Sequence, residues 1–491
     1  MEKKTKIIAT LGPSSDDVKT ITKLYKAGMN VARLNFSHGS YEYFETLISN
    51  VRSVSDEITI LLDTKGPEIR TSKVENNGKI ELKHNQKVLL GNDVSKFSTK
   101  DCIQLDYKHL FEVEEKNLIF IDDGSVGLEV EKVSKKDKLV EAKVKIPGVV
   151  ESKKTVSIRG HNVKIPFLSK KDKDDILFGI KQGVDVVAAS FVREVEDVVE
   201  LKDFLHKNKG DYIKVISKIE HGQALENIEG IIEESFGVMV ARGDLGVEAP
   251  IEKVPFIQEN VITMCNQAGK PVIVATQMLE SMKHSKVPTR AEVNDVAQAI
   301  IQGADCVMLS GETANGEYPT EALRMMNLIC KEYDSKVIGF IDSQNDSVSQ
   351  QNSKNSSLLM KKEVSLFVTK SAYYAARDLS AQAILVPTES GYSARKISRF
   401  KPECDIVAVC RDMNVLRQLQ LSWGVRAFYH KEGYKNQESM INTLVKELVS
   451  QKVLDKKRKV VVASGKVVNK EGHTNTLEIY RVEDILSRIV K

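Results

Sequence analysis

Residues Ile213–Glu220 read IKVISKIE, and further along Gly237–Asp244 reads GVMVARGD. The second stretch begins with the continuous apolar run GVMVA, the first is rich in Val and Ile, and both end in charged residues. Alternating polar and apolar residues would indicate a strand with one face in water, whereas a continuous apolar run is typical of a strand buried on both faces. Such strands occur in parallel sheets that helices cover, so these two stretches predict an α/β fold.

The same pattern repeats over the first two thirds of the chain. Amphipathic stretches separate the runs, and we predict helices there, for example over Leu168–Gln182 and Arg290–Gln302, each stopped by a glycine. Eight buried strands with intervening helices indicate a (β/α)8 barrel, the TIM barrel. The predicted strands are Thr5–Leu11, Val31–Phe36, Thr59–Thr64, Val184–Phe191, Ile213–Glu220, Gly237–Arg242, Pro271–Thr276 and Cys306–Thr313.

Residues 66–166 interrupt this rhythm, because they contain no convincing long helix. They consist of short alternating runs of Val, Ile, Lys and Glu with turn signals at Asn77-Gly78 and Asp123-Gly124. We predict a small β-barrel domain inserted after the third barrel strand. Loops at the carboxyl ends of the strands form the active face of such barrels, so the insertion is well placed to act as a lid.

The stretch 343–357, SQNDSVSQQNSKNSS, is rich in Ser, Asn and Gln, and we predict an exposed, mobile linker there. Strand and helix patterns alternate again beyond it, which indicates a separate doubly wound α/β domain over 358–491. The predicted division is a catalytic barrel from 1–65 and 167–342, an inserted β lid of 66–166, the linker, and a C-terminal regulatory domain.

The composition excludes several classes of protein. The 491 residues include 72 Lys and Arg and 68 Asp and Glu, a net charge of +4, which argues against nucleic-acid binding and against a polybasic membrane surface. No apolar run approaches a membrane span or a signal peptide. The six cysteines form no CxxC pair, which favours a reducing, cytoplasmic location, and the nine histidines show no zinc-site spacing, so a metal would sit on carboxylates.

Charged side chains collect at the carboxyl ends of the predicted strands, where function resides in such barrels. Glu220 and Asp244 come from adjacent strands and can share one hard divalent cation. Lys218 lies two residues before Glu220, so both point to one face of their strand. Arg33 adds a second positive charge for an anionic group, most simply a phosphoryl.

Each of these residues also has an ordinary structural interpretation. Lys218 can be the ion-pair partner of Glu220, and Arg33 can cap a loop. An inert barrel end, however, has no reason to collect buried charges of both signs, so their convergence on one mouth favours an active site.

Seven ordered motifs resemble the pyruvate kinase family, and the match covers essentially the whole chain. They are IATLGPSS (Ile8–Ser15), NVARLNFSHG (Asn30–Gly39), LDTKGPEIRT (Leu62–Thr71), ISKIE (Ile216–Glu220), MVARGDLG (Met239–Gly246), ATQMLESM (Ala275–Met282) and MLSGETA (Met308–Ala314). The resemblance implies a (β/α)8 barrel with an inserted β domain and a C-terminal α/β domain. It also implies the last step of glycolysis, phosphoenolpyruvate + ADP + H⁺ → pyruvate + ATP.

The resemblance further implies roles for single residues. Lys218 matches the lysine that stabilises the phosphoryl group in transit, Arg33 matches the arginine that contacts it, and Thr276 matches the position where the enolate is protonated through water. The matching ligand sets are Glu220 and Asp244 for Mg²⁺ or Mn²⁺; Gly243, Asp244 and Thr276 for the substrate carboxylate; Asn35, His38, Arg70 and Lys154 for the nucleotide; and Asn35, Ser37, Asp63 and Thr64 for K⁺.

Glu68 bears on the need for K⁺. Potassium-dependent members resemble this sequence with Glu at that position, whereas potassium-independent members place a Lys whose ammonium substitutes for the ion. The resemblance therefore implies K⁺ dependence, although Glu68 can also be only a charge at the base of the lid.

The loop TESGYS, Thr388–Ser393, lies between a predicted strand and a predicted helix. Its hydroxyls and glycine suit a phosphate, and the resemblance implies an allosteric sugar phosphate or AMP at Thr388, Ser390, Gly391 and Ser393. Glu389 would repel a phosphate, and an ordinary capped loop explains the same residues equally well. The resemblance also implies a homotetramer.

Two other functions fit parts of the sequence. A lyase or aldolase of the phosphoenolpyruvate barrel type would share a metal-bound enolate, but it would not need Arg70, the K⁺ set or the lid; a coupled assay for ATP formation separates the two. An inactive scaffold would be expected to lack Lys218, Glu220 or Asp244, and all three are present.

Overall fold

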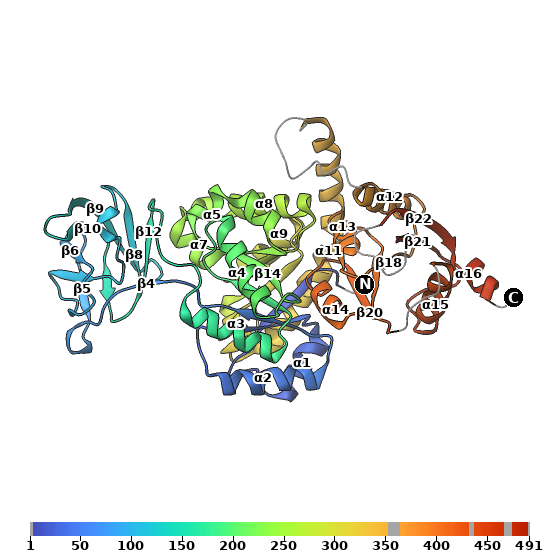
Figure 1. The fold of residues 1–491 in the computed structure, drawn as a ribbon, viewed down its shortest axis with the longest axis horizontal. Coiled ribbons are helices and arrows are strands. Elements are labelled where there is room, and N and C mark those ends of the chain that lie inside the picture. Colours follow the sequence, from blue (N-terminus) through green and yellow to red (C-terminus); the bar gives the residue numbers. More distant parts are fainter. Residues whose placement is uncertain (1–2, 352–363, 432–436, 466–473, 490–491) are drawn as a thin grey trace.

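Eight parallel strands close into a barrel at the centre of the molecule (Figure 1). The computed structural model describes residues 3–351, 364–431, 437–465 and 474–489. The barrel strands are β1 (Lys6–Thr10), β2 (Val31–Asn35), β3 (Thr59–Asp63), β13 (Val186–Ala189), β14 (Lys214–Ile219), β15 (Gly237–Ala241), β16 (Val272–Ala275) and β17 (Cys306–Leu309). They follow one another around the barrel in sequence order, and β1 pairs with β17 to close it. All eight predicted strands are confirmed.

The barrel strands are buried on both faces, as their composition predicted. One face of each strand fills the barrel interior, where Ile8, Ile216 and Met239 pack together. The other face packs under the surrounding helices in a separate, larger core. These helices are α1 (Val18–Ala27), α2 (Tyr41–Val54), α3 (Lys170–Gln182), α4 (Val195–Lys207), α5 (Gly222–Glu226), α6 (Ile228–Glu234), α7 (Arg242–Glu248), α8 (Val254–Ala268), α9 (Arg290–Ile301), α10 (Gly311–Ala314) and α11 (Pro319–Gln351).

Local signals set the ends of the helices. The α3 helix begins at Ser169, which forms a capping box with Asp172, and it ends at Gly183 in the left-handed conformation with φ 68°. Thr289 and Glu292 form the same box at the start of α9. Asp17 rather than an earlier residue caps α1, because its side chain accepts a hydrogen bond from the Thr20 N–H.

The insertion forms a β domain at one end of the molecule (Figure 1). Its strands are β4 (Ile69–Arg70), β5 (Ile80–Leu82), β6 (Lys87–Gly91), β7 (Cys102–Gln104), β8 (Leu118–Ile121), β9 (Val126–Ser134), β10 (Leu139–Ile146), β11 (Gly148–Val150) and β12 (Thr155–Arg159). Seven of them form one sheet in the order β4-β12-β8-β9-β10-β6-β7, and β5 pairs with β11. A bridge between Thr71 and Leu105 joins the two edges of the large sheet, so it curls around a single core.

The C-terminal domain lies at the opposite end (Figure 1). It contains α12 (Val364–Asp378), β18 (Ala383–Pro387), α13 (Tyr392–Ser398), β19 (Asp405–Cys410), α14 (Met413–Leu419), β20 (Val425–Tyr429), α15 (Gln437–Ser450), β21 (Lys459–Ser464), β22 (Thr476–Arg481) and α16 (Val482–Ile489). The sheet order is β20-β19-β18-β21-β22, with a hydrophobic core on each face, as a doubly wound domain requires. The sequence analysis missed β22, an antiparallel edge strand that is partly exposed.

The segment predicted as a linker differs from the expectation. Helix α11 continues through residues 343–351, and residues 352–357 lie outside the described parts of the chain. Extending an existing helix by one residue fixes only that residue for one new hydrogen bond, so polar residues with modest helix propensity can prolong a helix that a core-facing segment has already nucleated.

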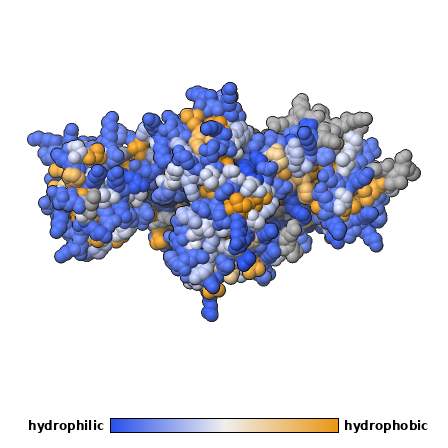
Figure 2. All heavy atoms as spheres, turned by 90° about the horizontal axis from the view of Figure 1, so that it is seen from below, coloured by the Kyte–Doolittle hydropathy of each residue, from blue (hydrophilic) through white to orange (hydrophobic). Residues whose placement is uncertain are grey.

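The C-terminal domain docks on the end of the barrel where the strands begin. Lys401 is fully buried there, and its Nζ lies 2.8 Å from Asp305 Oδ1 at the foot of β17. Arg417 pairs in the same way with Asp185 at the foot of β13. The outer surface is predominantly hydrophilic with small apolar patches (Figure 2), and within the described residues no helix combines the length and apolarity that a bilayer span requires.

Candidate active site

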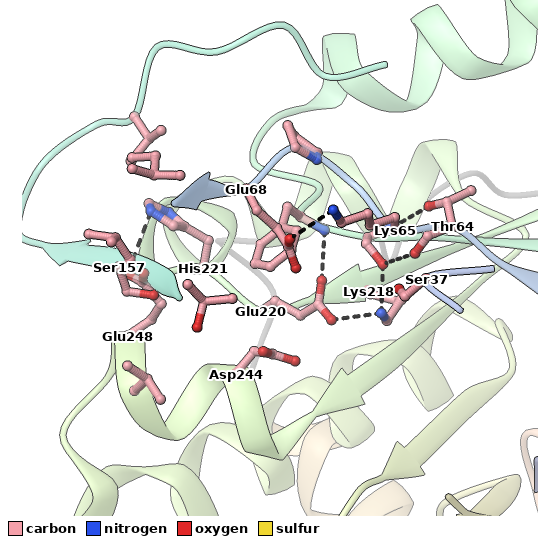
Figure 3. Close-up of a pocket in the computed structure, with 18 of the residues that line it drawn as sticks. Ser37, Thr64, Lys65, Glu68, Ser157, Lys218, Glu220, His221, Asp244 and Glu248 are labelled. Atoms are coloured by element: carbon pink, nitrogen blue, oxygen red, sulfur yellow. Dashed lines mark hydrogen bonds and ion pairs between the residues drawn. The ribbon is translucent and has the colours of Figure 1, made fainter. Parts of the chain in front are cut away.

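A cavity of about 630 Å³ lies between the carboxyl ends of the barrel strands and the lid (Figure 3). It brings together residues that the sequence places far apart. Ten of the predicted site residues line it: Arg33, Asn35, Ser37, His38, Asp63, Thr64, Arg70, Lys218, Glu220 and Asp244.

Lys218 stands at the centre of this arrangement. Ile219 packs into the core between strands and helices, so its neighbours Lys218 and Glu220 face the mouth. The Lys218 ammonium lies 2.8 Å from Glu220 Oε1 and 3.1 Å from Asp63 Oδ1 (Figure 3). Burial by itself would lower the pKa of Lys218, but the two carboxylates outweigh it and raise that pKa above its ordinary value. The side chain therefore stays charged.

Arg33 holds the other oxygen of Asp63. Its Nε lies 2.6 Å from Asp63 Oδ2, and its Nη1 donates to Thr10 Oγ1 at 2.8 Å. Burial would raise the pKa of Asp63, but Arg33 and Lys218 together hold it below its ordinary value. Asp63 thus aligns two cations side by side, which suits an anion with several oxygens.

Glu220 and Asp244 form a buried carboxylate pair. Burial raises the pKa of both side chains. The charge of Asp244 raises the pKa of Glu220 further, whereas a hydrogen bond with Glu220 offsets part of the rise at Asp244. The Phe191 N–H donates to Glu220 Oε2 at 2.7 Å, which fixes that side chain. Two adjacent carboxylates in a buried mouth fit a hard divalent cation, because the cation would relieve their repulsion. No larger cluster of His, Cys, Asp or Glu suited to a metal occurs in the described residues.

Gly243 and Thr276 border the cavity beside Asp244 rather than lining it. The Gly243 N–H donates to Thr276 Oγ1 at 2.9 Å, and that hydroxyl donates to the Ala275 carbonyl at 2.6 Å. Thr276 has φ 67°, which is a rare conformation for a β-branched residue. Such strain is concentrated at functional sites.

The residues matched to K⁺ lie together at the ends of β2 and β3. Asn35 Oδ1 accepts a hydrogen bond from the Ser37 N–H at 3.2 Å, and the Thr64 carbonyl accepts one from Ser190 Oγ at 2.7 Å. Glu68 lines the same cavity, where Arg70 Nε donates to its Oε2 at 2.9 Å. Oxygen atoms of side chains and backbone thus share one corner of the site.

Lys154 is the predicted site residue that lies apart. Its Nζ pairs with Asp122 at 3.2 Å and with Glu151 at 3.3 Å on the lid, and it does not line the cavity. Its neighbour Thr155 does line the cavity. Successive residues near a strand point to opposite faces, so sequence position alone could not settle which side of the lid Lys154 occupies.

The sequence analysis missed Ser190, which lies at the end of β13. Its hydroxyl accepts a hydrogen bond from Lys218 Nζ at 2.6 Å, and it donates to the Thr64 carbonyl. Ser190 therefore links Lys218 by hydrogen bonds to Thr64, one of the residues matched to K⁺. Its position at the end of the fourth apolar run is the signal that could have indicated it.

The lid contacts the barrel through residues that the sequence analysis also missed. Arg159, at the end of β12, donates to the carbonyls of Val247 and Ala249, the latter at 3.0 Å. The Ser157 side chain bonds to Glu248, whose pKa burial raises to about 7. His221 Nε2 lies 3.5 Å from Glu248 Oε2, and burial lowers the pKa of His221 to about 4 (Figure 3). The lid thus contacts the C-terminal end of α7, the helix whose first turn contains Asp244.

The loop Thr388–Ser393 forms a tight turn before α13. Thr388 Oγ1 accepts a hydrogen bond from the Gly391 N–H at 2.9 Å, and Ser393 Oγ bonds to Thr474. Glu389 pairs with Arg411 at 3.0 Å, so the repulsion of a phosphate that the sequence suggested is largely neutralised.

Comparisons with known proteins agree across the chain. The family model described as the pyruvate kinase barrel domain matches residues 2–323, and that of the pyruvate kinase alpha/beta domain matches residues 367–480. A pyruvate kinase of Bacillus licheniformis is 41% identical over 99% of this chain and 82% of the relative. One of Clostridium acetobutylicum is 40% identical over 98% of this chain and 100% of the relative. The crystal structure of a pyruvate kinase from Cryptosporidium parvum superimposes with a TM-score of 0.90 and 35% identity, covering 98% of this chain and 96% of that one.

Proposed function

Since this chain belongs to the pyruvate kinase family and transfers the phosphoryl group of phosphoenolpyruvate to ADP, we propose that Lys218, Arg33 and the carboxylates Glu220 and Asp244 carry that transfer. The observation that supports this assignment most strongly is the position of the charged Lys218 ammonium, held between Asp63 and Glu220 in the same cavity as Asp244.

Phosphoryl transfer leaves little covalent work to the protein, and positioning and charge stabilisation lower most of the barrier. Arg33 and Lys218 present their charges to the oxygens of the phosphoryl group as it leaves enolpyruvate. Asp63 keeps both cations in place, and its lowered pKa keeps it ionised while it does so. Asp63 acts here as a positioning residue.

The family requires a divalent cation, and we propose that Glu220 and Asp244 hold it as Mg²⁺ or Mn²⁺. When bound, the ion supplies positive charge to the phosphoryl oxygens and to the developing enolate. The Gly243 N–H and the Thr276 hydroxyl lie beside Asp244, where they can orient the substrate carboxylate. We also propose that Thr276 serves the position from which the enolate takes its proton through water.

We propose that His38, Arg70 and Asn35 contact the nucleotide, since all three line the cavity. Lys154 would join them only if the lid turned, because in this arrangement it pairs with Asp122 and Glu151. Asn35, Ser37, Asp63 and Thr64 would hold K⁺. Glu68 supports that proposal, because its carboxylate cannot substitute for the cation. The nearby Lys65 ammonium and Arg70 guanidinium are both paired with Glu68.

The test of this function is initial-rate kinetics in a coupled assay of ATP formation from phosphoenolpyruvate and ADP. Activity should require a divalent cation and should fall when K⁺ and NH₄⁺ are both left out. Rates that do not change when the divalent cation is chelated would contradict the assignment of Glu220 and Asp244.

We further propose a cytoplasmic homotetramer whose domains are 1–65 with 167–342, 66–166 and 358–491. Three separate groups of hydrophobic cores support this division. Large apolar side chains remain exposed on the barrel, among them Ile251 at 76% and Phe256 at 66%, which is consistent with contacts between copies. Light scattering coupled to size-exclusion chromatography measures the oligomeric state directly.

A further inference from the structure

A second cavity lies between the barrel and the C-terminal domain, at the end of the barrel opposite the active site. Its volume is about 320 Å³, which is within the range of small-molecule sites. The barrel contributes residues at the feet of β14 and β15 and from α4 and α6, and the C-terminal domain contributes Ser390 and Arg395. In Figure 1, α13, which carries Arg395, lies on the side of the C-terminal domain that faces the barrel.

The cavity carries an excess of positive charge. Four cations line it, Lys202, Lys214, Lys270 and Arg395, against two carboxylates, Asp211 and Glu234, which leaves a net charge of +2 (four minus two). Both carboxylates are already engaged. Glu234 pairs with Lys202, and Asp211 pairs with His206 at 2.6 Å.

Lys270 and Arg395 line the same cavity, and neither forms an ion pair with its two carboxylates. Lys270 Nζ donates to the backbone carbonyls of Glu233 and Ser235, the former at 2.9 Å. Arg395 donates to the Ser390 carbonyl at 3.0 Å, and its guanidinium lies 4.8 Å from the centre of the Phe236 ring. Among the described residues, no acidic side chain lies within salt-bridge distance of either cation.

Electrostatics indicate that these cations repel one another. Burial, together with the charges of Arg395 and Lys202, lowers the pKa of Lys270 to about 8. Burial likewise lowers the pKa of Arg395 to about 10. Like charges in a half-buried cavity are unfavourable, and a bound anion would reverse that effect.

We propose that this cavity binds a small phosphate monoester, with its phosphate group among Lys202, Lys270 and Arg395 and its carbon skeleton against the apolar wall of Val215 and Phe236. A phosphate fits better than a carboxylate, because three oxygens can meet three cations and because the guanidinium pairs with phosphate in a bidentate fashion. The volume suits a metabolite and is too small for a nucleic acid or a protein segment.

The site differs from the loop Thr388–Ser393, whose own phosphate binding is a separate prediction. The two share only Ser390, and Thr388 does not line the cavity. Because Arg395 belongs to the C-terminal domain and the lysines to the barrel, the anion would join the two domains. A ligand that binds only the folded protein raises its melting temperature, so binding here should be visible without any measurement of activity.

The test uses the full-length protein, isothermal titration calorimetry and thermal unfolding, with ribose 5-phosphate as the phosphate monoester. Inorganic phosphate and uncharged ribose are the comparison ligands. We expect ribose 5-phosphate to bind and to raise the melting temperature, inorganic phosphate to bind more weakly, and ribose not to bind.

Five variants locate the binding. Lys270→Met and Arg395→Met should each weaken binding of ribose 5-phosphate at least tenfold, and Lys202→Met should do so at an exposed position where folding is not at risk. Lys207→Met is the matched control, because Lys207 is an exposed lysine on the same helix that does not line the cavity. Glu234→Gln should strengthen binding, since it frees Lys202.

Any of four results would overturn the proposal or its assignment to a monoester. Ribose 5-phosphate would fail to bind the wild-type protein at millimolar concentration, or Lys202→Met would bind it as the wild type does. Alternatively, Thr388→Ala would abolish binding while Lys202→Met retained it, which would place the ligand in the Thr388–Ser393 loop. Equal affinity for inorganic phosphate and ribose 5-phosphate would overturn the assignment of a monoester.

Discussion

Replacing Lys218 with Met removes a charge that the geometry of the mouth depends on. The ammonium lies 2.8 Å from Glu220 and 3.1 Å from Asp63. Two cations, Arg33 and Lys218, face three carboxylates there, so the variant would present one more net negative charge to an anionic substrate. Loss of a cation that stabilises a phosphoryl group in transit lowers turnover by about 10³–10⁵-fold, which corresponds to about 4–7 kcal/mol in the barrier.

The assay is kcat for pyruvate formation, measured together with the melting temperature. Lys401→Met is a matched control, because it also removes a buried ammonium from a carboxylate, at 2.8 Å, but at the far end of the barrel. Removing one partner of a buried pair costs about 3–5 kcal/mol, so both variants should melt at lower temperature while only Lys218→Met loses turnover. A Lys218→Met protein that is folded and retains kcat within a factor of ten of wild type would refute this reasoning.

Asp244→Asn should raise the divalent-cation concentration for half-maximal activity at least tenfold; an unchanged metal titration would contradict the proposed ligand pair. Omitting K⁺ and NH₄⁺ should lower turnover, and Glu68→Lys should make the enzyme less dependent on them, whereas full wild-type activity without either ion would exclude the K⁺ site. Burial raises the pKa of Glu248 to about 7. Between about pH 4.5 and 7 the folded protein therefore keeps a proton on Glu248 that the unfolded chain has released. Wild-type stability should therefore fall by up to about 3 kcal/mol as pH rises through that window, and denaturant unfolding of Glu248→Gln should lack this part of the decline. Fructose 1,6-bisphosphate, ribose 5-phosphate and AMP should be titrated against phosphoenolpyruvate half-saturation, where no shift for any of them would remove the effector role of the Thr388 loop.

Continuous apolar runs made the barrel predictable. The run Gly237–Arg242 appears as β15 over Gly237–Ala241, whose five residues GVMVA are all buried, because a strand buried on both faces is apolar along nearly its whole length. Partly exposed strands leave a weaker pattern. The edge strand β22, which contains Glu478 and Arg481 beside apolar residues, was missed for that reason.

The site was predictable where function lies directly at a strand end. Lys218, Glu220 and Asp244 follow apolar runs, so their convergence could be inferred from barrel topology. Contacts between domains produce no such pattern in the sequence. The hydrogen bonds from Arg159 to the end of α7 depend on how the lid folds back over the barrel, and the direction of the Lys154 side chain depends on the register of a β domain whose pairing no local pattern fixes.

The pairing of β1 with β17 has a consequence for how the chain is made. Lys6 lies opposite Cys306 in the register of those strands, so the ribosome must add 300 residues after the first strand before the last one can meet it. At about 5–20 residues per second, that interval is about 15–60 s. The inserted β domain, which has its own core, is fully synthesised well within that time. During this interval β1 of the nascent barrel has no partner on one edge, although the inserted β domain can already fold. Unpaired strand edges promote aggregation, so this is the period in which the chain most needs protection.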